Sequence, residues 1–189
     1  YSVMPILSIL IISLFNFPKE IALGFIILGS CPGGTASNVI AYICGANLSL
    51  SIFCTFASTI MAVIFTPLLI FLLADENIGI NTVGLIKSTF LIVFIPVLLG
   101  LFLKLIIKNK DQNYLEFFPL FAEVAVAFII AVIFAINSEN IYKISFLVLV
   151  GVVLHNLIGL YFSFQVAKFL EFPDDVKKTV SIEVAMQNS

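Results

Sequence analysis

The fold of this chain depends on the stretch Gly29-Ser30-Cys31-Pro32-Gly33-Gly34-Thr35-Ala36-Ser37-Asn38, which interrupts a long apolar segment. The segment runs from Ile21 to Ala74 without a charged residue. As one helix it would be about 80 Å long, whereas the apolar core of a bilayer is about 30 Å thick. It must therefore break. Proline removes a backbone donor and glycine loosens the backbone, so we expect one break here and another at Gly45-Ala46-Asn47.

The composition of the whole chain points to a membrane. Of its 189 residues, 61% are hydrophobic and 11% are charged, and the mean hydropathy is +1.20. A soluble domain has about a quarter of its residues charged, so an ordinary soluble enzyme is excluded. The net charge of −2 leaves no basic surface for nucleic acid, and the lipid bilayer is the expected surrounding.

Apolar segments separated by charges or turn residues predict an all-α integral membrane protein with one domain over residues 1–189. Stretches of about 18 or more apolar residues are long enough to span a bilayer. We expect about seven helices or part-helices, at residues 2–15, 21–43 with a break near Pro32, 48–74 with Pro67 inside, 81–107 with Pro96 inside, 115–136, 144–170 and 174–189.

The distribution of lysines predicts an orientation. One cluster lies at residues 104–110 and another at 168–178, whereas the alternate loops at 75–81 and 138–142 are acidic or neutral apart from Lys143 close by. Lysine-rich loops stay on the cytoplasmic side. We therefore expect both clusters in the cytoplasm and the protein in the plasma membrane.

Polar residues at the first break predict a functional site. If a half-helix begins near Thr35, then Thr35, Ser37 and Asn38 lie where backbone N–H groups are free and the helix dipole is positive. Broken helices inside a membrane occur where they line a cavity or are buried in protein. The alternative is a plain kink in which these side chains satisfy the freed backbone.

A second polar stretch surrounds Glu183. This residue lies about 15 Å into the helix that starts at Pro173, near the middle of a bilayer. A charge at that depth costs about 2.5–3.5 kcal/mol on insertion scales, so a bound cation is expected, with Gln187 four residues on along the same face. The alternative is that Glu183 pairs with Lys177 or Lys178.

A stripe of hydroxyls lies on the segment at 48–74. Ser51, Thr55 and Ser58 follow a spacing of four and then three residues, which places them on one helix face. Such hydroxyls often bond back to their own helix. Together with the polar residues of the two breaks, they would supply the oxygen ligands that a small alkali cation prefers.

The motifs resemble those of the bile acid:sodium symporter family. The resemblance extends over nearly the whole chain and rests on residues 31–38, 45–47, 50–51, 154–156 and 183–189. It implies a ten-helix transporter of two inverted five-helix repeats with two crossed, discontinuous helices. The chain would then be an internal fragment, with helices upstream of Tyr1 and a closing helix beyond Ser189. Ala185 stands where the family commonly has glycine.

Carried over residue by residue, the resemblance implies two sodium ions and one organic anion. One sodium site would use Ser37, Asn38, Ser51, Thr55 and Glu183. A second would share Glu183 and add the Gln187 side chain with the backbone carbonyls of Val184 and Met186. The anion would meet Thr35 and Asn188 at the crossing point.

The resemblance therefore predicts a sodium-coupled symporter of a bile acid or a smaller carboxylate, working by alternating access. An exporter of another solute, such as arsenite, would want a thiolate at Cys31 or Cys44. A membrane enzyme would use Glu183 or His155 as acid or base, but no catalytic pairing pattern accompanies them. A purely structural helical bundle would not need an acidic residue such as Glu183 near the middle of the bilayer. The sequence leaves the identity of the anion and the oligomeric state open.

Three further features stay open at this point. His155 and Asn156 lie in an apolar segment, where an interhelical hydrogen bond is the commoner role and a proton relay the alternative. Glu123 is an acid inside a span and either snorkels or lines the cavity. The cysteines at 31, 44 and 54 lack metal-ligand spacing and are expected to be small buried apolar residues.

Overall fold

The computed structural model describes residues 1–74, 117–138 and 146–187, together with positions 84, 87, 88, 91, 95, 99 and 102. The predicted lysine cluster at 104–110 and the loop at 75–81 lie outside these residues, as do most of the predicted span at 81–107 and most of the loop at 138–142.

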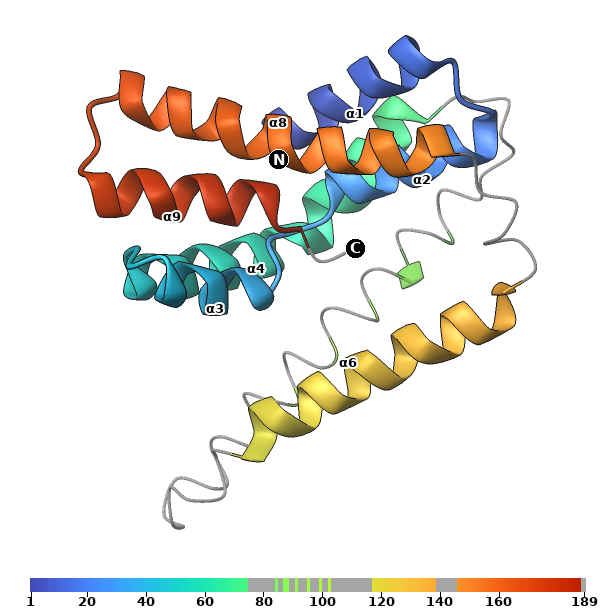
Figure 1. The fold of residues 1–189 in the computed structure, drawn as a ribbon. Coiled ribbons are helices and arrows are strands. Elements are labelled where there is room, and N and C mark those ends of the chain that lie inside the picture. The colour runs from blue at the N-terminus through green and yellow to red at the C-terminus, as the bar shows by residue number, and fades with distance from the viewer. Residues whose placement is uncertain are drawn as a thin grey trace.

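The described part of the chain is helical, as predicted. Figure 1 labels the helices α1, Val3–Phe15; α2, Lys19–Ser30; α3, Ala36–Ile43; α4, Leu48–Leu73; α6, Phe117–Ile136; α8, Phe146–Phe169; and α9, Asp174–Ala185. The predicted breaks are confirmed, because α2 and α3 are separated at residues 31–35 and α3 and α4 at residues 44–47. Proline residues begin α2 and α9, where Pro18 and Pro173 occupy the N-cap position.

The helices form a bundle around the two breaks (Figure 1). Helices α1 and α2 form one hairpin and α8 and α9 another, and α8 also packs on α1. Helix α4 contacts α2, α3 and α9, so it links both hairpins. Figure 1 draws α6 to one side of this bundle. The ends of α2 and α9 and the start of α3 consequently lie together.

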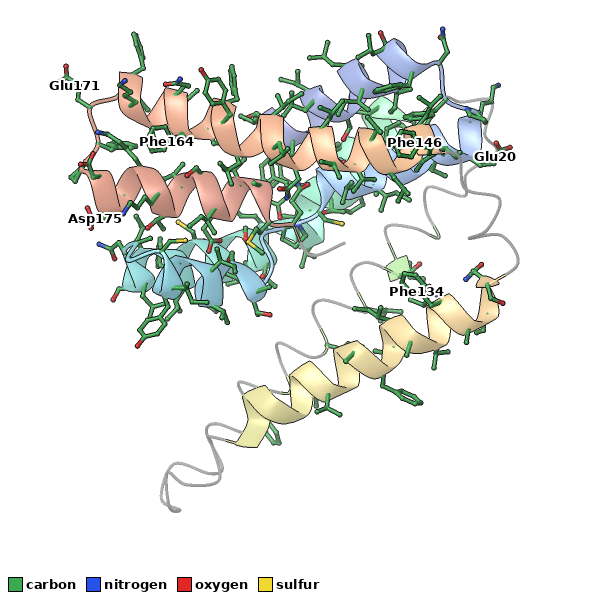
Figure 2. All side chains as sticks on the ribbon, in the orientation of Figure 1. Glu20, Phe134, Phe146, Phe164, Glu171 and Asp175 are labelled. Carbon is green, nitrogen blue, oxygen red and sulfur yellow. The ribbon has the colours of Figure 1, made fainter. Side chains whose placement is uncertain are left out.

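Two of the described helices are long and apolar enough to cross a bilayer. Helix α4 has 26 residues and α8 has 24, with mean hydropathies of 2.4 and 2.0. Both carry large apolar side chains on their outer surfaces, such as Phe53, Phe71 and Phe162. In Figure 2 the labelled acids lie at opposite ends of the bundle, Glu20 at one end and Glu171 with Asp175 at the other. Apolar helices with charges at their ends are typical of membrane spans.

Helix α8 ends in a turn that forces a glutamate into the left-handed region. Glu171 has a φ of 56°, and its N–H donates to the Lys168 carbonyl at 3.0 Å. The next residue, Phe172, donates to the Ala167 carbonyl at 3.2 Å. These two bonds make a Schellman cap, in which glycine normally occupies the left-handed position.

We expect Glu171→Gly to raise the stability of the protein, because it relieves this backbone strain. The gain is about 0.5–1 kcal/mol, or roughly 2–4 °C in the unfolding midpoint measured in detergent. Glu20→Gly is the matched control, since Glu20 lies in the first turn of α2 and glycine there weakens a helix. Equal shifts in both variants would contradict this account of the cap.

Candidate functional site

The two unwound segments cross each other backbone to backbone. Gly33, between α2 and α3, pairs with Gln187, beyond the end of α9, in an isolated antiparallel bridge. The N–H of Gly34 donates to the Met186 carbonyl at 2.8 Å. Backbone groups freed by the breaks thus bond to each other, as they must inside a membrane.

Glycine at position 33 lets the first break approach Glu183 closely. A Cβ atom on Gly33 would lie 2.9 Å from Oε2 of Glu183 and 3.5 Å from its carbonyl oxygen. Real Cβ contacts are essentially never shorter than 3.0 Å. The absence of a side chain at Gly33 therefore lets the Glu183 carboxylate lie against the first broken helix.

Glu183 is buried in a cluster of hydroxyls. Its side chain is 8% exposed, and its Oε1 accepts hydrogen bonds from Ser37 at 2.5 Å and from Ser51 at 2.5 Å. Thr55 donates to Oε1 at 3.1 Å or to Oε2 at 3.0 Å. Asn38 lies beside them, with its Oδ1 accepting from Ser51 at 2.8 Å. Three helices, α3, α4 and α9, thus bring the five residues of the first predicted sodium site together.

The Glu183 carboxylate is surrounded by neutral donors in this cluster. The hydroxyls of Ser37, Ser51 and Thr55 carry one proton each, which is enough to pair both carboxylate oxygens and Oδ1 of Asn38. The Gly34 carbonyl already accepts from the Ser37 N–H at 3.0 Å. These hydrogen bonds do not neutralise the charge, and a buried charge without a counter-charge is costly. A cation among these oxygens, or a proton on Glu183, would remove that cost.

Lysine does not supply this positive charge in the described part of the chain. The Lys177 ammonium lies 2.9 Å from Asp174 on the surface of α9, and Lys178 donates to the Cys44 carbonyl at 3.3 Å. The alternative in which either lysine neutralises Glu183 is therefore wrong. Helix geometry explains this: a lysine six or five residues before Glu183 lies on another face, toward the membrane surface.

Gln187 reaches the site by a different route from the predicted one. Helix α9 ends at Ala185, so the prediction that Gln187 shares a helical face with Glu183 is wrong. Its amide nitrogen, Nε2, instead donates to the carbonyls of Gly29 at 2.9 Å and Cys31 at 3.1 Å, at the end of α2. Its Oε1 is buried and accepts no hydrogen bond from the described residues. An acceptor oxygen is therefore left free beside the crossing.

A cavity of about 330 Å³ opens beside the crossing. Its wall combines the start of α3, the unwound end of α9 and the middle of α8, with the residues Leu28, Gly34, Thr35, Ala36, Val152, His155, Asn156, Ala185, Met186 and Gln187. Thr35, predicted to contact an anion, is thus part of the wall. Asn188, its predicted partner, lies outside the described residues.

His155 and Asn156 tie α8 to its neighbours. The buried His155 ring lies 3.0 Å from the Ser8 hydroxyl and 3.1 Å from the Met4 carbonyl, both on α1. Asn156 donates to the Ala185 carbonyl, in the last turn of α9, at 2.8 Å. These contacts agree with the predicted interhelical hydrogen bond. The side chain of Glu123 is not among those that the structure describes.

Two polar features of the site did not follow from the sequence. Ser58, the third hydroxyl of the stripe, accepts a hydrogen bond from the Gly33 N–H at 3.3 Å rather than facing the carboxylate. Asn47, expected only as a break, bonds the start of α9 through Thr179 and Asp175. In the sequence, the polar character of Asn47 beside a turn is the only indication of this contact, and it does not show that the partners lie on α9.

Apolar spans, a helix broken at residues 31–35, the unwound end of α9 that pairs with this break, and a buried carboxylate without a lysine partner are together typical of membrane transport proteins. Residues 1–144 match the model of the sodium bile acid symporter family. That match covers most of the chain, and the chain therefore belongs to this family. Its members are transporters and not enzymes, which removes the membrane-enzyme alternative.

Curated relatives extend the similarity to the whole chain. All 189 residues align with the uncharacterized sodium-dependent transporter YocS of Bacillus subtilis (strain 168), at 35% identity and covering 59% of that protein. The probable sodium/metabolite cotransporter BASS1, chloroplastic, of Arabidopsis thaliana is 38% identical over 189 residues, with 47% of its length covered. The P3 protein of Homo sapiens is 31% identical, with 40% covered. The chain thus spans about half the length of the curated relatives it matches.

Proposed function

We propose that the protein is a sodium-coupled symporter of a small organic anion that works by alternating access. One observation carries this proposal: the Glu183 carboxylate is buried among neutral hydroxyl and amide groups, and neither Lys177 nor Lys178 neutralises it. The single negative charge of Glu183 among neutral oxygens balances one monovalent cation, and the charge of a second sodium would be balanced by the bound anion. Oxygen ligands suit a hard ion such as sodium.

The first sodium would lie among Ser37, Asn38, Ser51, Thr55 and Glu183. When an ion enters, the hydroxyls of Ser37 and Thr55 can turn their protons away from Glu183 and offer a lone pair instead. The alternative acceptors are already in place, since Ser37 is also 2.6 Å from the Gly34 carbonyl and Thr55 is 3.1 Å from the Ser51 carbonyl. Binding would therefore need rotation of hydroxyl protons and little movement of the helices.

A second sodium would lie closer to the crossing. It would share Glu183 and take the unpartnered Oε1 of Gln187 with the backbone carbonyls of Val184 and Met186. The Met186 carbonyl accepts one hydrogen bond from Gly34, which leaves its second lone pair for an ion. The free oxygen of Gln187 is the observation that favours this site.

The anion would enter the cavity beside the crossing. At the start of α3 the N–H groups of Ser37 and Asn38 donate to the Gly34 and Thr35 carbonyls, whereas the first residue, Ala36, has no acceptor within its own helix. The helix dipole adds positive potential there. We propose that a carboxylate binds at this helix end, with Thr35 and Asn188 as side-chain contacts. Substrate choice between bile acids and smaller carboxylates follows from the rest of the cavity wall.

Transport would be the work of a ten-helix protein with two inverted repeats, of which residues 1–189 form one transmembrane part. We propose the plasma membrane as its site, with the lysine clusters at 104–110 and 168–178 in the cytoplasm. Two sodium ions with one monoanion carry a net charge of +1. A tenfold sodium gradient and 100 mV then provide about 5 kcal/mol, enough for more than thousandfold accumulation.

Uptake into proteoliposomes tests this function. A panel of radiolabelled carboxylates, from bile acids to small keto acids, is offered with an inward sodium gradient or with potassium in its place. We expect sodium to stimulate uptake of at least one anion at least tenfold. Uptake driven by a proton gradient without sodium would replace sodium coupling with protonation of Glu183. Failure of both ions to drive any anion would overturn the proposal.

A further inference from the structure

Helices α4 and α9 touch at two levels that are one helical turn apart. At one level Ser51 of α4 bonds Glu183 of α9, inside the hydroxyl cluster. At the other, the Asn47 N–H donates to the Thr179 hydroxyl at 2.9 Å. Asn47 and Thr179 each precede their counterparts, Ser51 and Glu183, by four residues. The two helices therefore run side by side in the same direction. A shift of α9 along α4 that changed the contact at Asn47 would therefore change the contact at Ser51 by the same amount.

Asn47 forms hydrogen bonds at this level through its backbone N–H and its side-chain amide, and its carbonyl accepts from the Ser51 N–H at 3.0 Å. Its backbone N–H reaches Thr179, and its Nδ2 donates to Oδ2 of Asp175 at 3.1 Å. Its Oδ1 accepts from the Leu50 N–H at 3.1 Å and so caps the start of α4. Thr179 is fully buried. One residue thus begins α4 and holds the first turns of α9.

The turn before Asn47 is held by backbone and side-chain hydrogen bonds. Gly45 has a φ of 61°, and the N–H of Ala46 donates to the Ala41 carbonyl at 2.9 Å. These features form a Schellman cap on α3. The Lys178 ammonium reaches the carbonyl of Cys44 in the same turn. Helix α9 therefore contacts the short connection between α3 and α4 at residues 44–47, which its own hydrogen bonds hold in place.

We propose that Asn47, Asp175 and Thr179 form a register clamp that sets sodium affinity without touching the ion. This inference rests on the proposed function, because it assigns the positioning residues of the same sodium site. The clamp acts through geometry: moving α9 by one residue shifts Glu183 by about 1.5 Å along the axis and turns it by about 100°. Either change would take the carboxylate out of reach of Ser37 and Ser51.

Exchange of the two clamp side chains tests the proposal. In Asn47→Asp the cap on Leu50 is kept, because aspartate caps as well as asparagine does, but two carboxylates then face each other. We expect the sodium concentration for half-maximal uptake to rise about tenfold, with the maximal rate at saturating sodium nearly unchanged. In the double variant Asn47→Asp/Asp175→Asn the donor and acceptor change places. We expect that variant to return to within about threefold of the unchanged protein.

The control variant is Asp174→Asn, which removes a carboxylate from the same turn of α9 but not from the clamp. Among the described residues Asp174 pairs with Lys177 on the surface and not with the clamp, so sodium dependence should stay as in the unchanged protein. Unfolding midpoints in detergent are measured for all variants, so that loss of folded protein is separated from loss of affinity.

The possible results separate the clamp from the proposed function. If the unchanged protein shows no sodium dependence, the proposed function fails. If it depends on sodium but Asn47→Asp leaves the half-maximal concentration unchanged, the clamp is wrong and the function stands. A double variant as weak as Asn47→Asp would also overturn the clamp, because it would show that the effect does not arise from the paired side chains.

Discussion

Glu183→Gln is expected to abolish sodium-driven uptake. The variant keeps the shape of the side chain but removes the negative charge of the cluster. A bound cation would then bring an uncompensated positive charge into a buried place. We expect the half-maximal sodium concentration to rise at least about a hundredfold, which corresponds to about 2.7 kcal/mol of lost binding free energy. Uptake against sodium concentration in proteoliposomes measures this change.

Thermal unfolding gives a second measurement of the same change. Sodium should raise the unfolding midpoint of the unchanged protein, because an ion that binds only the folded state stabilises it. In Glu183→Gln that rise should disappear, while the sodium-free midpoint should be equal or higher. The matched control is Glu171→Gln, an equal chemical change at an exposed turn. A Glu183→Gln protein that keeps sodium stimulation would remove Glu183 from the ion site.

Gly33→Ala should have the next largest effect. The added methyl group would lie 2.9 Å from Oε2 of Glu183, so the carboxylate has to shift, while the backbone at position 33 is held by its pairing with Gln187. Overpacking of this kind costs about 1–3 kcal/mol, so we expect uptake to fall at least about tenfold and the unfolding midpoint in detergent to drop. Loss of sodium affinity should accompany the loss of rate, since the displaced atom is a proposed ligand.

Gly24→Ala is the matched control for that substitution. Gly24 lies within α2, and a Cβ atom there would have no heavy atom within 4 Å. Alanine favours a helix over glycine by about 0.5–1 kcal/mol, so this variant should be at least as stable as the unchanged protein. If both alanine variants behaved alike, the close approach at Gly33 would not explain the loss.

Much of the fold could be predicted from local chemistry. Pro32 with Gly33 and Gly34 marks a break because proline cannot continue a helix and glycine does not favour one. Residues 45–47 mark the next one for related reasons, with Gly45 in the left-handed region and Asn47 as the cap. These preferences act over a few residues, so they can be read from the sequence without knowing which helices pack nearby.

The error at Gln187 has the opposite origin. A helix through residues 183–187 is locally reasonable, and no proline or glycine interrupts it. It ends at Ala185 because the backbone of Met186 and Gln187 finds partners at Gly34 and Gly33, which are more than 150 residues away in the chain. Tertiary hydrogen bonds thus overruled a local preference for helix.

By itself, the sequence determined the membrane character, the helix breaks and the list of oxygen-bearing residues around Glu183. It did so because hydropathy and backbone preferences belong to single residues and their near neighbours. The tertiary structure decided which of those oxygens meet, that lysine is not the partner of Glu183 in the described part of the chain, and that Asn47 aligns α9 on α4. Such contacts join helices from distant parts of the chain, and their geometry depends on how the helices pack.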